Sequence, residues 1–258
     1  GDVYKRQGGA NAASNGGAAD VTQAAGTFAV GATGLSVVGG NGGTNAGASA
    51  GGAATLTTAG VSTITGDIAV TGGNADANDD ADGGAATATF TDDVTATAQT
   101  LTITGGDGHA SSNGDGGASI AKFIASGTFT SVVLNDGTAG TATAGGAQLQ
   151  FDNAAAETFT GAITAGTADH GTIDVDSANA TGVTFASQIG TSSVSVGNLL
   201  IDGAGASAVA CTNLLKKTGV PSKNIIMLDS KGVLYQGRDN LNQWKSTHAI
   251  ETKKRNLD

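Results

Sequence analysis

The sequence is poor in the residue types that usually build a large core or a covalent framework. Its 258 residues include one Cys, one Pro, one Met, one Trp and two Tyr. A single Cys excludes an internal disulfide framework. Because no run of about 18 apolar residues occurs, the sequence also predicts no transmembrane segment. Any core must therefore be built mainly from small aliphatic side chains and a few Phe.

Basic residues are nearly missing from most of the chain. Residues 8–198 contain 16 Asp or Glu and a single basic residue, Lys122. Residues 199–258 contain nine Lys or Arg against five Asp or Glu, so the formal charge changes from −15 to +4. This change predicts a boundary near residue 200 between two unrelated units. Since one Lys cannot neutralise a phosphate backbone, nucleic acid is excluded as a partner of the acidic unit.

Residues 1–7, GDVYKRQ, look foreign to the rest of the chain. Back-translated, residues 2–7 resemble the mosaic-end adapter left by transposon-based sequencing libraries. An ordinary basic N-terminus is the alternative. We expect an adapter-like, non-native segment, with the true N-terminus and any signal peptide outside the sequence.

Residues 8–198 repeat with a period of about 33. The repeat is marked by pairs of consecutive glycines in two sets. The first set begins at Gly16, Gly51, Gly83, Gly116 and Gly145, and the second at Gly39, Gly72 and Gly105. Helical repeats of similar length exist, but Gly and Thr are poor helix formers, and no apolar stripe of period 3.6 appears.

Apolar residues in this unit alternate with polar ones. Ile64, Ile68 and Val70 share one face, and Leu101 and Ile103 share another. Such alternation is typical of short strands with one buried face. The expected fold is therefore mainly β: a right-handed β-solenoid over residues 8–198, with two or three strands per repeat and less regularity after about Gly146. We expect the Gly pairs to supply positive-φ corners. Disorder is the alternative that the high Gly content leaves open.

This acidic unit resembles the Gly- and Thr-rich β-strand repeat proteins of bacterial surfaces, such as autotransporter passenger domains and adhesin-like proteins. The resemblance implies a structural or adhesive role at the cell surface or outside the cell, without catalysis. It also implies partners that are surface ligands or further stacked repeats.

Two features of the solenoid suggest ligands. The loop NADANDDAD brings together Asp76, Asp79, Asp80 and Asp82, and calcium needs several such oxygens. A solvated loop is the simpler interpretation, since the spacing matches no known calcium motif. Thr-x-Thr pairs recur along the unit, and a flat Thr ladder would suit ice binding. Thr also favours the solvent faces of strands, which explains the pairs equally well.

Residues 199–258 have a different pattern. An apolar run at Leu199 to Ile201 precedes Gly203 and Gly205, and Ala208 takes the third small position of Gly-x-Gly-x-x-(Gly/Ala). A helix is expected to run to Lys217, and a second parallel strand is expected to end at Asp229. This order indicates a Rossmann-like unit, in which the helix N-terminus meets a pyrophosphate and the acid meets a ribose hydroxyl.

Residues 203–258, beginning GAGASAVACTNLLKKTGV, closely resemble the start of the NAD(P)-binding domain of bacterial malic enzymes. The resemblance implies that Gly203, Gly205 and Ala208 frame the pyrophosphate turn and that Asp229 lies at the adenosine ribose. It places Ser230 and Lys231 where a 2′-phosphate could be recognised, so both NAD and NADP are possible cofactors. The parent family is cytoplasmic.

Malic enzymes oxidatively decarboxylate malate to pyruvate with a divalent metal. In that family the general-acid Tyr, the general-base Lys and the metal-binding carboxylates lie upstream of this turn. In this chain the acidic repeats occupy that part of the sequence. We therefore expect an incomplete α/β unit without catalysis, and we assign no catalytic residue. A fragment of a working malic enzyme is the alternative.

The string AGASA occurs at residues 46–50 and again at residues 204–208. Together with the change in composition, this repetition predicts that the chain is a chimera of two gene fragments. A true fusion of a surface solenoid with a nucleotide-binding tail is the alternative.

Overall fold

The structure is a computed structural model, and twelve stretches of the chain are described. They are residues 3–5, 15–43, 47–76, 80–109, 113–139, 144–152, 157–166, 170–175, 183–190, 196–202, 205–217 and 220–255.

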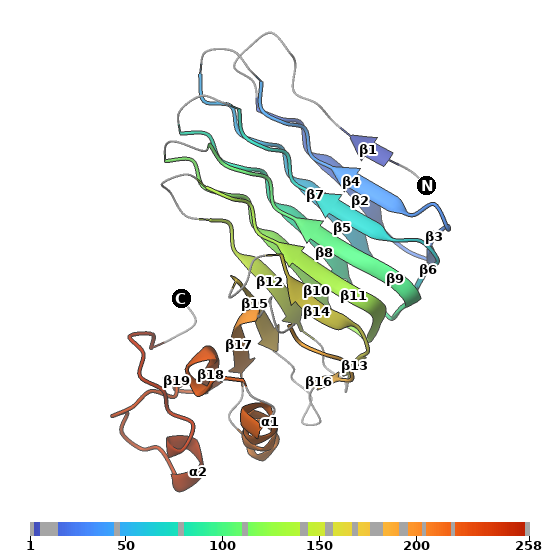
Figure 1. The fold of residues 1–258 in the computed structure, drawn as a ribbon. Coiled ribbons are helices and arrows are strands. Elements are labelled where there is room, and N and C mark those ends of the chain that lie inside the picture. Colours follow the sequence, from blue (N-terminus) through green and yellow to red (C-terminus); the bar gives the residue numbers. More distant parts are fainter. Residues whose placement is uncertain are drawn as a thin grey trace.

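Most of the chain is a β-solenoid built from two parallel sheets that face each other (Figure 1). The first sheet contains β2 (Ala19–Gln23), β5 (Ala54–Thr58), β8 (Ala86–Phe90), β10 (Ser119–Phe123), β12 (Ala147–Phe151) and β15 (His170–Val175). The second contains β1 (Val3–Lys5), β3 (Phe28–Val30), β4 (Leu35–Val38), β6 (Ser62–Ile64), β7 (Ile68–Thr71), β9 (Val94–Thr104), β11 (Gly127–Asn135) and β14 (Ala162–Ala165). A short pair, β13 (Glu157–Phe159) and β16 (Val183–Phe185), is separate. The predicted mainly-β solenoid is confirmed, whereas its handedness stays a prediction.

The strand register reproduces the repeat seen in the sequence. Ala54 pairs with Ala86 and Ala86 with Ser119, offsets of 32 and 33 residues. Ser119 then pairs with Ala147, an offset of only 28. The coils therefore shorten near Gly146, where the Gly-pair pattern also fades.

The core lies between the two sheets and agrees with the predicted alternation. Ile64, Ile68, Val70, Leu101 and Ile103 are all buried. The largest buried side chains form a stack along the solenoid. Phe90, Phe123 and Phe151 occupy matching positions of neighbouring strands, with ring centroids 5.2 and 5.8 Å apart. Aromatic stacking thus links successive coils where the aliphatic side chains are small.

The glycine pairs have a different role from the one expected. Positive φ occurs among the described glycines at Gly26, Gly34, Gly47, Gly171, Gly190, Gly232 and Gly237, and none of these belongs to a pair. The prediction that the pairs supply positive-φ corners is therefore wrong. They instead let the backbones of the two sheets approach until they hydrogen-bond directly.

These contacts form one continuous series, which we call the glycine ladder. Each N–H donates to the carbonyl of the preceding member, with N···O distances of 2.7–3.0 Å. The members are Gly17, Gly40, Gly52, Gly73, Gly84, Gly106, Gly117, Gly137 and Gly145. A side chain on Gly106 would overlap the carbonyl oxygen of Gly73, the equivalent glycine one coil earlier. Close backbone approach is thus the reason for glycine here.

The C-terminal part adds a small α/β unit to the end of the solenoid. Its elements are β17 (Val196–Asp202), α1 (Ala206–Lys217), the 3-10 turn η1 (Ser222–Asn224), β18 (Ile225–Asp229), β19 (Gly232–Val233) and α2 (Gln243–Ser246). β17 pairs in parallel with β15 of the solenoid on one side and with β18 on the other. The boundary expected at residues 198–199 therefore falls inside a strand that both units share.

Candidate nucleotide-binding site

The strand, helix and strand expected in the C-terminal unit are present. β17 includes Leu199 to Ile201, α1 ends at Lys217, and β18 runs parallel to β17 and ends at Asp229. Gly203 lies outside the described residues. The carbonyl of Gly205 accepts the first helical hydrogen bond, from the N–H of Val209 at 3.0 Å. Gly205 is exposed and a Cβ there would meet nothing within 4 Å, so its backbone is open to a ligand.

Ala208 packs inward. It lies against the second core cluster, made of Ile225, Met227 and Leu234. Thr212, one turn further along α1, is fully buried, and its hydroxyl contacts the sulfur of Met227 at 3.3 Å. A small residue at position 208 therefore lets α1 lie close to β18, as the third position of the Gly-x-Gly-x-x-(Gly/Ala) pattern requires.

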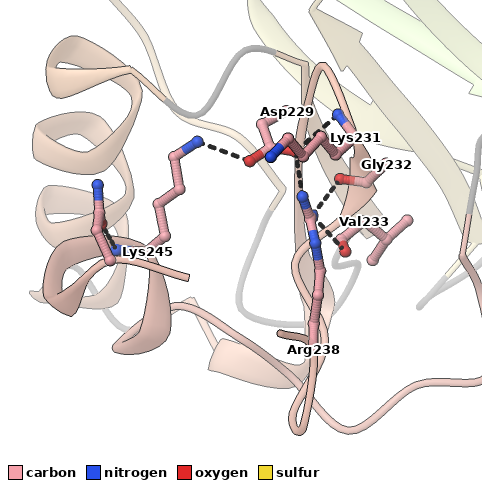
Figure 2. Close-up of polar contacts among 7 residues, drawn as sticks. Asp229, Lys231, Gly232, Val233, Arg238 and Lys245 are labelled. Atoms are coloured by element: carbon pink, nitrogen blue, oxygen red, sulfur yellow. Dashed lines mark hydrogen bonds and ion pairs between the residues drawn. The ribbon is translucent and has the colours of Figure 1, made fainter. Parts of the chain in front are cut away.

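Asp229 is held by two cations from later in the chain (Figure 2). Its Oδ1 accepts from the Arg238 guanidinium at 2.6 Å, and its Oδ2 accepts from Lys245 Nζ at 2.6 Å. The Lys231 backbone N–H donates to Oδ1 at 2.9 Å. Arg238 also donates to the carbonyls of Gly232 and Val233, at 2.8 and 2.9 Å. The carboxylate predicted to meet a ribose therefore lies between an Arg and a Lys.

These contacts control the protonation of Asp229. Burial by itself would raise the pKa of this carboxyl group. The hydrogen bonds from Lys245 and Arg238, the N–H of Lys231 and the charge of Lys245 outweigh burial and hold the pKa far below its usual value. Asp229 therefore stays ionised at pH values at which an ordinary Asp side chain becomes protonated.

The surroundings of Asp229 carry more positive than negative charge. Arg238 and Lys245 face the single carboxylate, and the exposed side chains of Ser230 and Lys231 come directly after it. The sequence prediction named Ser230 and Lys231 but missed Arg238 and Lys245. Their only signal in the sequence is that they are basic residues within 16 positions of Asp229. An excess of cations beside an acid and a backbone hydrogen-bond donor can bind a phosphate group.

A second polar pair connects α1 to the end of α2. Lys216 Nζ lies 2.9 Å from Nδ1 of His248, a residue that is 3% exposed. An ammonium only donates, so Nδ1 accepts and the ring proton sits on Nε2. That Nε2 is buried without a hydrogen-bond partner among the described residues. Burial and then the charge of Lys216 lower the pKa of His248, and burial lowers the pKa of Lys216.

The acids proposed for calcium take part in contacts between coils. Asp76 is buried, and its Oδ1 accepts from the Ser49 N–H at 3.4 Å, whereas Asp82 accepts from the Asp115 N–H at 2.8 Å. Asp80 lies in the same loop with φ 62°, and Asp79 lies outside the described residues. Within the described stretches, no three His, Cys, Asp or Glu side chains are grouped closely enough to hold a metal ion. Calcium binding in this loop stays a prediction.

The Thr pairs align across only part of the solenoid. Thr55 and Thr57 of β5 pair with Thr87 and Thr89 of β8. On β10 the corresponding positions hold Ile120 and Lys122, so a hydrophobic and a charged side chain interrupt the ladder. This arrangement favours the simpler interpretation, in which Thr is an ordinary residue of the solvent-facing side of a strand. Ice binding stays a prediction.

Among the described residues no helix is long and apolar enough to cross a membrane.

The comparisons with known proteins found similarity to malic enzymes. No family model matches the chain. It is 54% identical over 48 residues to an NADP-dependent malic enzyme of Rhizobium meliloti (strain 1021), covering 18% of this chain and 6% of that protein. It is 51% identical over 47 residues to the NADP-dependent malic enzyme of Halomonas elongata, covering 18% and 11%. A probable NADP-dependent malic enzyme of Rickettsia prowazekii is 46% identical over 48 residues, covering 18% and 6%. The chain therefore spans only 6 to 11% of the length of these curated relatives, and a short part of it is similar to NADP-dependent malic enzymes.

Proposed function

We propose that the chain is a structural, surface-type β-solenoid that carries an incomplete, non-catalytic NADP-binding unit of the malic-enzyme kind. The observation that carries the nucleotide proposal is the position of Asp229 between Arg238 and Lys245. The names of the similar proteins, which are NADP-dependent malic enzymes, support the same cofactor.

The charges around Asp229 favour NADP over NAD. Both oxygens of Asp229 already accept hydrogen bonds from cations, so a ribose 2′-hydroxyl would have to share the carboxylate with Arg238 and Lys245. A 2′-phosphate needs donors and positive charge, which Lys231, Arg238 and Lys245 supply within one loop and one short helix. A 2′-phosphate would thus gain charge-assisted hydrogen bonds that a hydroxyl group cannot replace.

The remaining parts of the dinucleotide have matching positions as well. The exposed Gly205 and the N-terminus of α1 present backbone N–H groups where a pyrophosphate would lie. Gly203 belongs to the same proposed turn, and Ala208 keeps α1 against β18. Gly203, Gly205, Ala208, Asp229, Ser230 and Lys231 are therefore our proposed cofactor-binding residues, to which we add Arg238 and Lys245.

The test is binding of NADP and NAD to the full chain, measured by calorimetry and by thermal stabilisation. A ligand that binds only the folded state raises its melting temperature. We expect NADP to bind more tightly than NAD, and Lys245→Gln to reduce this preference. Lys223→Gln is the matched control, because Lys223 is an exposed Lys of η1 at the opposite end of β18. Equal binding of the two nucleotides, or equal effects of the two variants, would contradict the proposal.

We propose further that the chain does not turn over malate. The resemblance assigns the acid, base and metal ligands of malic enzymes to sequence upstream of Gly203, and here that sequence is the solenoid. Incubation of the purified chain with malate, NADP and Mn²⁺ should produce no NADPH above a metal-free control. Turnover dependent on metal would support the alternative, a working fragment of a malic enzyme.

For the solenoid we propose a structural or adhesive role at a bacterial surface. Support comes from the parallel stack of strands, the acidic charge and the sequence repeat of about 33 residues. Circular dichroism should be dominated by strands, and the solenoid should bind cells or surface polymers without calcium. Adhesion that requires calcium would instead favour a metal site at Asp76, Asp79, Asp80 and Asp82.

We also propose that the two units come from two gene fragments, because composition and charge change abruptly where AGASA is repeated. Single DNA molecules from the source, read across the codons for residues 187–217, test this origin. Intact molecules that span the junction would establish a true fusion instead.

A further inference from the structure

The last coil of a parallel solenoid presents two unsatisfied surfaces. One is the edge of its final strand, whose backbone groups can pair with another chain. The other is the final layer of the hydrophobic core, which neighbouring coils cover elsewhere in the stack. In the described part of this chain, the last strand of the first sheet before the C-terminal unit is β15, and its buried Ile173 belongs to the solenoid core.

The C-terminal unit covers the strand edge. β17 pairs with β15 in parallel at five positions, from His170↔Val196 to Val175↔Ile201. β18 continues the same sheet, and the two-residue, antiparallel β19 ends it. A short terminal strand of this kind leaves little edge for another chain to extend.

One side chain of α1 connects the two cores. Leu215 packs against the solenoid core, which includes Ile173, and also against the C-terminal cluster of Ile225, Met227 and Leu234. Its neighbour Leu214 is 62% exposed. α1 therefore turns one Leu onto the end of the solenoid and the other into solvent. Figure 1 shows α1 beside β17, at the end of the stack opposite β1.

We infer that residues 196–255 act as the C-terminal cap of the solenoid and prevent it from stacking end to end with a second copy. At the other end, β2 pairs only with β5 among the described strands, so its second edge has no partner there. If β15 were uncovered, its edge would be free to pair in parallel with the β2 edge of another copy. Their pairing would be head to tail, so it would not close and would extend into filaments.

This role goes beyond the proposed function and does not depend on it. It rests on strand pairing and on Leu215, not on Asp229 or on any nucleotide. A chain that fails to bind NADP can still be capped, and a chain that binds NADP can lose its cap.

The test uses the full chain and two neighbouring substitutions of identical chemistry. Leu215→Asp places a carboxylate between the two cores, whereas Leu214→Asp places one in solvent on the same helix. The first readout is hydrogen exchange of residues 170–175, whose amides border β17. The second is mass across a concentration series, by light scattering after size exclusion, with electron microscopy of any large species.

We expect Leu215→Asp to speed exchange in residues 170–175 by about tenfold or more, since local opening raises exchange in proportion to the open population. We also expect concentration-dependent assemblies that extend as filaments. Leu214→Asp and the unchanged chain should remain protected and unassembled.

Three results would overturn the inference. They are equal behaviour of the two variants, faster exchange without assembly in Leu215→Asp, and assembly of the unchanged chain. If Leu215→Asp loses the strand signal of the solenoid itself, the pair Leu215→Ala and Leu214→Ala repeats the comparison with a milder change, judged by the same results.

Discussion

The glycine ladder can be tested with two adjacent glycines that the sequence does not distinguish. Gly145 and Gly146 form one Gly-Gly pair, but only Gly145 belongs to the ladder, through its N–H to the Gly137 carbonyl at 3.0 Å. A Cβ on Gly145 would overlap the Gly117 carbonyl, and its third-nearest atom, the Gly116 oxygen, would lie 2.9 Å away. A Cβ on Gly146 would meet nothing within 4 Å.

The expected cost of Gly145→Ala comes from these contacts. The obstacle is the backbone of the neighbouring coil, at Gly116 and Gly117, so the two coils must move apart locally. Losing one or two ladder hydrogen bonds costs about 1 kcal/mol each, and overpacking adds about 1–3 kcal/mol. We therefore expect unfolding free energy to fall by about 2–5 kcal/mol. Gly146→Ala should leave stability unchanged or raise it by about 0.4–1 kcal/mol, because the unfolded chain loses freedom.

The assay is urea unfolding monitored by far-ultraviolet circular dichroism, with hydrogen exchange of residues 137–152 as a local probe. With a slope near 3 kcal/mol/M, Gly145→Ala should lower the midpoint by about 1 M. Because solenoids can unfold in segments, the local exchange rates decide whether the damage begins at the ladder. Midpoints that agree for the two variants would refute the explanation of these glycines by close backbone approach.

Two further predictions concern the core and the C-terminal unit. Phe123 contacts the rings of Phe90, Phe129, Phe151 and Phe159, so Phe123→Ala should lower the free energy of unfolding, measured with urea, by about 3–5 kcal/mol. Phe185 contacts one ring among the described residues, that of Phe151, so Phe185→Ala should lower it clearly less. The folded pKa of His248 is lowered below 6.5, so its neutral form stabilises the C-terminal unit above that pH and this stability is lost as pH falls below 6.5. The protection factors of residues 205–217, which correct the measured rates for the intrinsic slowing of amide exchange at lower pH, should therefore fall between pH 7.5 and 5. His248→Gln should flatten this dependence; an unchanged dependence in that variant would show that another group controls it.

The alternation of apolar and polar residues and the spacing of the glycine pairs were sufficient to predict the architecture. The alternation at Ile64, Ile68 and Val70 placed these side chains on one face of a strand, because successive residues of a strand point to opposite sides. The spacing of glycine pairs predicted a repeat of about 33, which the strand register reproduces until the coils shorten after Ser119. The helix ending at Lys217 and the parallel strand ending at Asp229 were likewise predicted from local signals.

The roles of individual residues were harder to predict wherever the partner is distant in sequence. Asp229 was assigned to a ribose because an acid commonly ends that strand, but Arg238 and Lys245 reach it only after the chain turns back through β19 and α2. Asp82 was considered a calcium ligand, whereas its oxygen accepts from the Asp115 N–H one coil further on. Neither contact can be predicted from a sequence pattern, because each joins two segments that are separated in the sequence and meet only in the folded chain.

The sequence by itself determined that this protein alternates apolar and polar residues, repeats about every 33 residues, and changes in composition near residue 200. These properties depend only on the local geometry of strands and turns and on charge. The tertiary structure alone decided that paired glycines allow two backbones to hydrogen-bond, that Asp229 is held between two cations, and that Leu215 joins the two cores. Each of these depends on segments that become neighbours only when the chain folds, so no pattern within a single segment contains them.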